Sequence, residues 1–182
     1  MWRMQKTILM IVAVALVGCA STPLFNPNNK DHVAIEKEIR KRANKPTGEL
    51  TKADFEKVTR FALDRNGLTN ISPLARLTQL EDITLSHNNL TDVSAVEGLT
   101  QLRRLNLKDN QLTDGQLKHL AGLKQLVILD LYRNQFTDIS ALAGLTQLES
   151  LNLDNNPDLT KAQIAELQKA LPKCKIRSNA KK

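Results

Sequence analysis

Residues 80–90 read LEDITLSHNNL, and residues 102–112, which lie 22 positions later, read LRRLNLKDNQL. In both segments the first, fourth, sixth and last positions are apolar, and the ninth is asparagine. The alternation at the centre of each segment has the period of a β-strand, so one face turns inward and the other outward. These segments therefore predict one short strand per unit, with aliphatic side chains on its buried face.

The same pattern recurs along much of the chain. Its asparagines are spaced by 22, 22, 24 and 22 residues, and they are Asn66, Asn88, Asn110, Asn134 and Asn156. The later copies carry the apolar residues Leu126, Leu129, Leu131 and Phe136, and then Leu148, Leu151 and Leu153. A fixed period of this length is typical of stacked structural units, each of which buries its apolar face against its neighbours.

Two features of each unit predict how its turns are held. The asparagine amide both donates and accepts, so it can satisfy backbone groups in the turn after the strand and join neighbouring units in a ladder. The segment Leu90-Thr91-Asp92 and its equivalents place a short acceptor where it can cap the turn or 3₁₀ segment that follows. The third unit is two residues longer, over 115–123, which favours a true helix there.

With five copies in register, residues 58–176 resemble the leucine-rich repeat family, in the short bacterial form similar to internalins. The resemblance implies an α/β solenoid with a short curved parallel sheet on its concave face and 3₁₀ or helical segments on its convex face. We expect a helical N-terminal cap over 31–57 and repeats over 58–158. Residues 159–182 are then a C-terminal capping helix, a last strand and a basic tail.

The caps have signatures of their own. Asp31 is predicted as the N-cap of a helix that places Ile35, Ile39 and Ala43 on one face. Thr51-x-x-Asp54 predicts the start of a second, shorter helix. At the far end, residues 160–163 fit a capping box, and Pro172 ends the helix that follows them.

Residues 1–18 have the three parts of a secretory signal: a basic start, an apolar run over 8–17 and small residues at the end. The apolar run is too short to span a bilayer, which takes about 20 residues. Leu16-Val17-Gly18-Cys19 resembles the lipobox of bacterial lipoproteins, which implies cleavage before Cys19 and acylation of its sulfur. The alternative is an ordinary signal peptide with an unrelated cysteine.

If Cys19 is acylated, the chain is anchored to a membrane through its lipid. Ala20 is not the aspartate associated with inner-membrane retention, so the resemblance implies the outer membrane of the cell envelope. Residues 19–30 then form the lipidated cysteine and a flexible tether. Whether the protein faces the periplasm or the outside stays open.

The net charge is +7, and the chain without residues 1–18 carries 24 basic and 19 acidic residues. Much of this excess lies near the C-terminus, in Lys173, Lys175, Arg177, Lys181 and Lys182. Two interpretations stay open: contact with an anionic glycolipid or cell wall, or a solvated terminus. No aromatic residues interleave these charges, so we do not expect a nucleic-acid partner.

The sequence contains no recognisable catalytic motif. His32, His87 and His119 lie in unrelated contexts, and no H-E-x-x-H, G-x-S-x-G, Walker or paired-cysteine metal motif occurs. We therefore expect neither an enzyme nor a metal or cofactor. Cys174 alternates with Ile176, which predicts a core-facing strand position and no disulfide with Cys19.

Function is therefore expected on the outward side of the strands. Tyrosine and arginine are favoured as interface anchors, and Tyr132 is the only tyrosine in the chain. The predicted patch consists of Arg104, Asn106, Lys108, Ile128, Asp130, Tyr132 and Arg133, with His87 at its edge. We expect a protein partner, from a host or from the envelope, bound by a monomer. The alternative is that these are solvated strand residues, with Asp130 paired to nearby arginines.

Overall fold

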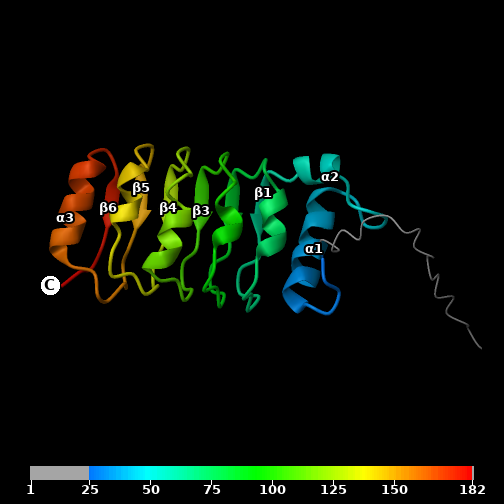
Figure 1. The fold of residues 1–182 in the computed structure, drawn as a ribbon, viewed down its shortest axis with the longest axis horizontal. Coiled ribbons are helices and arrows are strands. Elements are labelled where there is room, and N and C mark those ends of the chain that lie inside the picture. The colour runs from blue at the N-terminus through cyan, green and yellow to red at the C-terminus, as the bar shows by residue number, and fades with distance from the viewer. Residues whose placement is uncertain (1–24, 182) are drawn as a thin grey trace, which may run out of the picture.

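Six short parallel strands form one sheet, and each strand is hydrogen-bonded to the next in chain order. The computed structural model describes residues 25–181, and Figure 1 shows them as an elongated stack with helices at both ends. The strands are β1 (Arg60–Ala62), β2 (Asp82–Thr84), β3 (Arg104–Asn106), β4 (Ile128–Asp130), β5 (Ser150–Asn152) and β6 (Lys175–Arg177). The central residues pair in register as Phe61, Ile83, Leu105, Leu129, Leu151 and Ile176. The predicted solenoid is confirmed.

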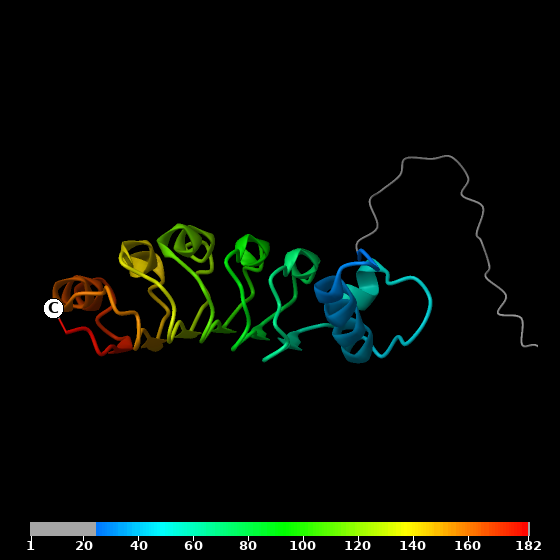
Figure 2. The ribbon, with the colours of Figure 1, turned by 90° about the horizontal axis from the view of Figure 1, so that it is seen from below.

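Four 3₁₀ segments lie on the opposite side of the core from the sheet (Figure 2). They are η1 (Ser72–Arg76), η2 (Ser94–Val96), η3 (Asp114–His119) and η4 (Ser140–Gly144). As predicted, Asp92 Oδ1 accepts from the N–H of Ser94 at 2.8 Å, and Asp138 Oδ1 accepts from that of Ser140 at the same distance. Asp114 departs from the prediction, because it lies inside η3 and its Oδ1 accepts from the N–H of Thr137 in the next unit at 2.7 Å. These segments follow the outer arc in Figure 2, so the sheet forms the concave face.

The expectation of a true helix in the longer third unit is wrong. Residues 114–119 form a 3₁₀ helix, in which the N–H of Leu120 bonds to the carbonyl of Leu117 and that of Ala121 to Lys118. In a 3₁₀ helix each hydrogen bond joins residues three apart, whereas in an α-helix it joins residues four apart. The two extra residues of this unit therefore lengthen a 3₁₀ segment and do not form an α-helix.

The core is a stack of aliphatic layers. Leu85, Leu107, Leu131 and Leu153, one from each of four successive units, are all fully buried. Burying a leucine side chain stabilises a protein by about 1.5–3 kcal/mol, so the stack supplies the main favourable term. Because each layer contacts only the layers beside it, the ends need separate covers.

The predicted asparagine ladder is confirmed for four of the five repeat positions. Asn110 Oδ1 accepts from the N–H of Leu90 at 3.1 Å, and its Nδ2 donates to the carbonyls of Leu85 (3.1 Å) and Leu107 (3.0 Å). Buried asparagines bridge neighbouring units in the same way at Asn88, Asn134 and Asn156. Asn66 is exposed, and its side-chain amide donates only to the carbonyl of Asp64.

The N-terminal cap contains α1 (Lys30–Arg42) and α2 (Lys52–Glu56). Ile35 and Ile39 on α1 are fully buried against the first repeat, as the sequence predicts. The N-cap of α1 is Asn29, not Asp31, because the Asn29 side chain accepts from the N–H groups of residues 31 and 32. Asp31 instead lies inside the first turn and is buried.

The C-terminal cap is α3 (Lys161–Ala170), which begins with the predicted capping box between Thr160 and Gln163. β6 follows it, and Cys174 just before that strand is buried with a free thiol. The predicted secretory signal and Cys19 lie outside the described residues. Within residues 25–181, no helix combines the length and apolar character needed to cross a bilayer.

Candidate functional site: the concave sheet

The outward residues of the six strands form two adjacent columns on the concave sheet. Ile128 belongs to the first column and is 39% exposed, and the only other large hydrophobic residue exposed among residues 25–181 is Val33 on α1. Ile128 pairs with Arg104 on one side and Ser150 on the other. The columns are Arg60, Asp82, Arg104, Ile128, Ser150 and Lys175, and Ala62, Thr84, Asn106, Asp130, Asn152 and Arg177.

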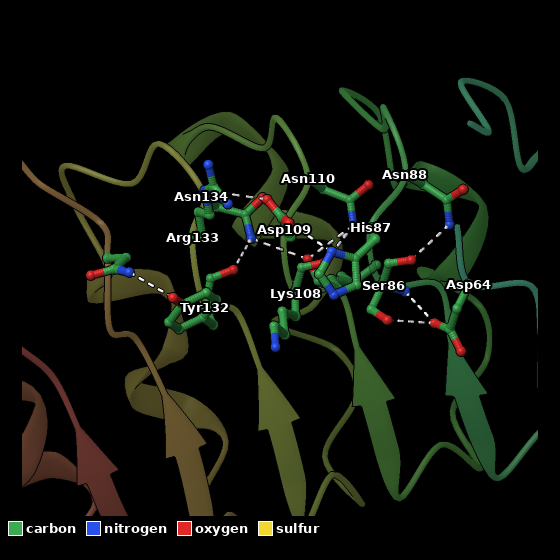
Figure 3. Close-up of polar contacts among 12 residues, drawn as sticks. Asp64, Ser86, His87, Asn88, Lys108, Asp109, Asn110, Tyr132, Arg133 and Asn134 are labelled. Atoms are coloured by element: carbon green, nitrogen blue, oxygen red, sulfur yellow. Dashed lines mark hydrogen bonds and ion pairs between the residues drawn. The ribbon is translucent and has the colours of Figure 1, made fainter. Parts of the chain in front are cut away.

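Tyr132 lies just beyond the carboxyl end of β4 and is held from two sides. Lys108 Nζ lies 5.0 Å from the centre of its ring, within cation–π range, and Asn155 Nδ2 donates to its hydroxyl at 2.7 Å. Figure 3 shows Lys108 and Tyr132 beside one another above the strand ends. The ring is therefore fixed before any partner arrives, which lowers the entropic cost of binding.

Asp130 does not pair with an arginine within the described residues. Its Oδ1 accepts from the N–H of Tyr132 at 3.0 Å, and Asn106 Oδ1 accepts from that of Lys108 in the same way. The alternative that Asp130 neutralises nearby arginines is therefore wrong. Arg104 approaches Asp82 instead, at 3.8 Å.

A third row of side chains lies at the turn after each strand. The backbone there is left-handed in all five repeats, with φ between 52° and 60°, at Arg65, His87, Asp109, Arg133 and Asn155. His87 Nδ1 lies 2.7 Å from Asp109 Oδ2, and Arg133 Nε lies 3.4 Å from Asp109 Oδ1. Asp109 therefore joins two of the predicted patch residues across three repeats (Figure 3).

Not every outward position is accessible. Ser86 is buried because both its N–H and its hydroxyl donate to Asp64 Oδ1, at 2.7 and 2.6 Å. Asp154 is buried beneath an ion pair with Arg177. Both side chains therefore bond within the sheet and are not free to contact a partner.

Sequence analysis missed two residues of the concave face. The sequence groups Lys175 and Arg177 with the basic C-terminus, but β6 pairs with β5 and places them opposite Ser150 and Asn152. The alternation of Cys174 with Ile176 was the available signal. Where β1, β2 and β3 begin, Arg60, Asp82 and Arg103 line a hollow of about 300 Å³ beside Arg104.

Within the described chain no three His, Cys, Asp or Glu side chains converge as metal ligands would. The histidines lie apart: His32 contacts Ser72 Oγ at 3.3 Å, and His119 Nδ1 lies 2.8 Å from Glu97 Oε2 on the convex side. Each therefore has a local partner of its own.

The model of the leucine rich repeat family matches residues 56–112 and 100–157, which together exceed half of the chain. The chain belongs to the leucine-rich repeat family. The leucine-rich repeat is a non-enzymatic binding fold, and the repeat domain is of this kind. Comparison with curated protein sequences gave no significant match.

Solved structures of other leucine-rich repeat proteins share this fold. An internalin (InlF) of Listeria monocytogenes is 28% identical with a TM-score of 0.72, over 80% of this chain and 43% of its own. Internalin C2 of the same species is 26% identical with a TM-score of 0.72, over 82% and 66%. A Leptospira interrogans leucine-rich repeat protein is 28% identical with a TM-score of 0.62, over 70% and 33%. The chain thus spans less than two thirds of each relative.

Proposed function

We propose that this leucine-rich repeat protein is a recognition module that binds a protein partner through its concave sheet. The observation that carries the proposal is Ile128, a large aliphatic side chain left 39% exposed on a strand between Arg104 and Ser150. Tyr132 lies two residues beyond the same strand and is already held by Asn155 and Lys108. An exposed aliphatic group beside a fixed aromatic ring and an arginine has the composition of an interface hot spot.

The binding role is tested by capture of membrane proteins on the purified full chain after chemical crosslinking. Arg104→Glu combined with Tyr132→Ala is expected to abolish recovery of the partner, because the charge and the aromatic anchor are both lost. Arg76→Glu combined with Lys118→Ala is the matched control, since both side chains are exposed on the convex side. Equal recovery with both double variants would remove the concave sheet from consideration.

The same proposal includes a lipid anchor on Cys19 and a place in the bacterial outer membrane. Its support is the sequence of residues 16–19 and the residue that follows them. Labelling cells with radioactive palmitate is expected to mark the wild-type chain and to leave Cys19→Ser unlabelled, with that variant no longer in the membrane fraction. Labelling of Cys19→Ser would contradict the anchor. Protease treatment of intact cells then distinguishes surface display from periplasmic residence.

One observation favours a second candidate function, an envelope protein that associates with an anionic glycolipid or the cell wall. Residues 159–182 contain seven basic residues and one acidic residue, whereas the repeats over 58–158 contain nine basic and twelve acidic residues. One end of the solenoid is therefore much more basic than its body. Association with anionic vesicles that falls steeply with salt and survives Tyr132→Ala would favour this candidate.

A further inference from the structure

The C-terminal end of the sheet carries a polar hollow that lies outside the strand columns. It has a volume of about 580 Å³ and lies where the turn after β5 meets the segment that follows β6. Arg133 and Lys181 lie at this hollow with the amides of Asn155 and Asn179, and Pro157 and Ala180 add apolar surface. We propose that this hollow binds an anionic saccharide, a sugar that carries a phosphate, sulfate or carboxylate group.

The charge of the hollow supports an anionic ligand. None of the described residues that line it is acidic. Arg133 turns its Nε toward Asp109 at 3.4 Å, so its two terminal nitrogens remain available for a bidentate contact with an oxyanion. Lys181 forms no ion pair with any residue in 25–181 and adds a second cation.

The side-chain amides of Asn155 and Asn179 favour a sugar as the ligand over a bare anion. Asn155 and Asn179 are joined twice: the Asn155 N–H donates to Asn179 Oδ1 at 2.8 Å, and Asn179 Nδ2 donates to Asn155 Oδ1 at 2.6 Å. Asn155 also donates to the Tyr132 hydroxyl. Each amide therefore keeps one hydrogen and a lone pair for hydroxyl groups, in an orientation that is already fixed.

The size of the hollow and its apolar surface agree with this ligand class. A phosphate ion alone would fill only a small part of about 580 Å³. Pro157 and Ala180 offer apolar surface against which the C–H face of a sugar ring can pack. The hollow adjoins the partner-binding surface through the bond between Asn155 and Tyr132, but the proposal does not rest on the role of Ile128. It would give the second candidate function a defined ligand site.

The test is calorimetric titration of the full chain, purified in detergent, with four probes. These are N-acetylglucosamine 6-phosphate, its 6-sulfate analogue, neutral N-acetylglucosamine and inorganic phosphate. At least one acidic sugar is expected to bind about tenfold more tightly than either the neutral sugar or inorganic phosphate. The two acidic sugars distinguish a phosphorylated source from a sulfated one. Equal affinity for all four probes, or no binding, would overturn the proposal.

Variants locate the site. Lys181→Gln is expected to weaken binding of the acidic sugar about five- to tenfold, and the nearly isosteric Asn179→Asp to abolish it by placing a carboxylate in the hollow. Lys118→Gln and Asn89→Asp are the matched controls at exposed positions elsewhere. Lys181 is exposed, so its variant is expected to fold even if Asn179→Asp does not. Unchanged affinity in Lys181→Gln would contradict the site, and it would leave partner capture through Ile128 unaffected.

Discussion

Asp31 on α1 accepts hydrogen bonds from both the N–H and the hydroxyl of Thr69 in the first repeat, each at 2.8 Å. The same carboxylate oxygen also accepts from the N–H of Asn70 at 2.9 Å. Asp31 is almost fully buried, so these bonds replace the water that it would otherwise bind. This one side chain therefore joins the helical cap to the stack that it covers.

Replacing Asp31 with alanine should destabilise the whole domain. The substitution leaves the two backbone N–H groups and the Thr69 hydroxyl without their acceptor, and an unsatisfied buried group costs about 1–3 kcal/mol. Urea unfolding of the full chain measures the free energy of unfolding. Asp158→Ala is the control, because Asp158 is exposed. An equal loss in the free energy of unfolding in both variants would contradict the role of Asp31.

Buried carboxylates in the cap should also make the free energy of unfolding depend on pH. Burial alone would raise the pKa of Asp31, but the hydrogen bonds from Thr69 and Asn70 outweigh it and hold that pKa below its ordinary value of 3.8. The Lys45 ammonium, Thr51 and Lys57 lower the pKa of Asp54 further still. A carboxyl group with a lowered pKa stabilises the folded state above its unfolded pKa, and this contribution is lost as pH falls through the folded pKa.

The free energy of unfolding should therefore decline as the pH falls below about 3.8, where protonation begins to favour the unfolded chain. The decline should be shallower in Asp31→Ala, which has lost one of the titrating groups. Urea titrations at several pH values between about 2 and 5 measure both slopes. Parallel pH profiles for the wild type and the variant would show that Asp31 carries none of the effect.

The asparagine ladder allows an internal comparison. The Asn110 side chain makes four hydrogen bonds that span two units, whereas the Asn66 side chain at the equivalent position is exposed and donates only to the carbonyl of Asp64. Asn110→Ala should therefore lower the free energy of unfolding by about 1–3 kcal/mol. Asn66→Ala should lower it by clearly less, and thermal melting of both variants provides the check. A larger loss in Asn66→Ala would refute the bridging role.

Cys174 should be chemically inert in the folded chain. Burial raises the pKa of its thiol above the ordinary value of 9.0, and the side chain is only 4% exposed. Since the thiolate is the reactive form, alkylation by iodoacetamide at neutral pH should be slow in native protein and rapid in urea. Mass spectrometry of the peptide that contains Cys174 follows the modification. Equal rates in both conditions would mean that the position is not packed.

The sequence predicted the repeats well because each inward residue is repeated at a fixed spacing. Leu105 and Leu129 pair in register as that spacing requires. The alternation of Cys174 with Ile176 also predicts the last strand, which β6 confirms. No asparagine motif marks this strand, so the sequence does not show that Arg177 joins the concave face. The bond between Asp31 and Thr69 joins residues 38 positions apart, and no local pattern reports such a pair.

The candidate site was predictable only in part. Outward orientation follows from alternation, so the exposed position of Ile128 could be expected. The hydrogen-bond and ion-pair partners of the polar side chains could not be predicted, because they depend on the three-dimensional arrangement of the strands and turns. Asp130 bonds to the N–H of Tyr132, and Asp154 is covered by Arg177. The spacing of the motifs does not indicate which group each of these side chains bonds to.

The outward side chains of the stacked strands are proposed to contact a protein partner. A photo-crosslinking amino acid placed at position 128 tests it in intact cells, with the same amino acid at position 76 on the convex side as the control. Position 128 is expected to give a discrete crosslinked species that disappears when Tyr132→Ala is added, and position 76 is expected to give none. Crosslinks of equal yield from both positions, or from position 76 alone, would contradict it.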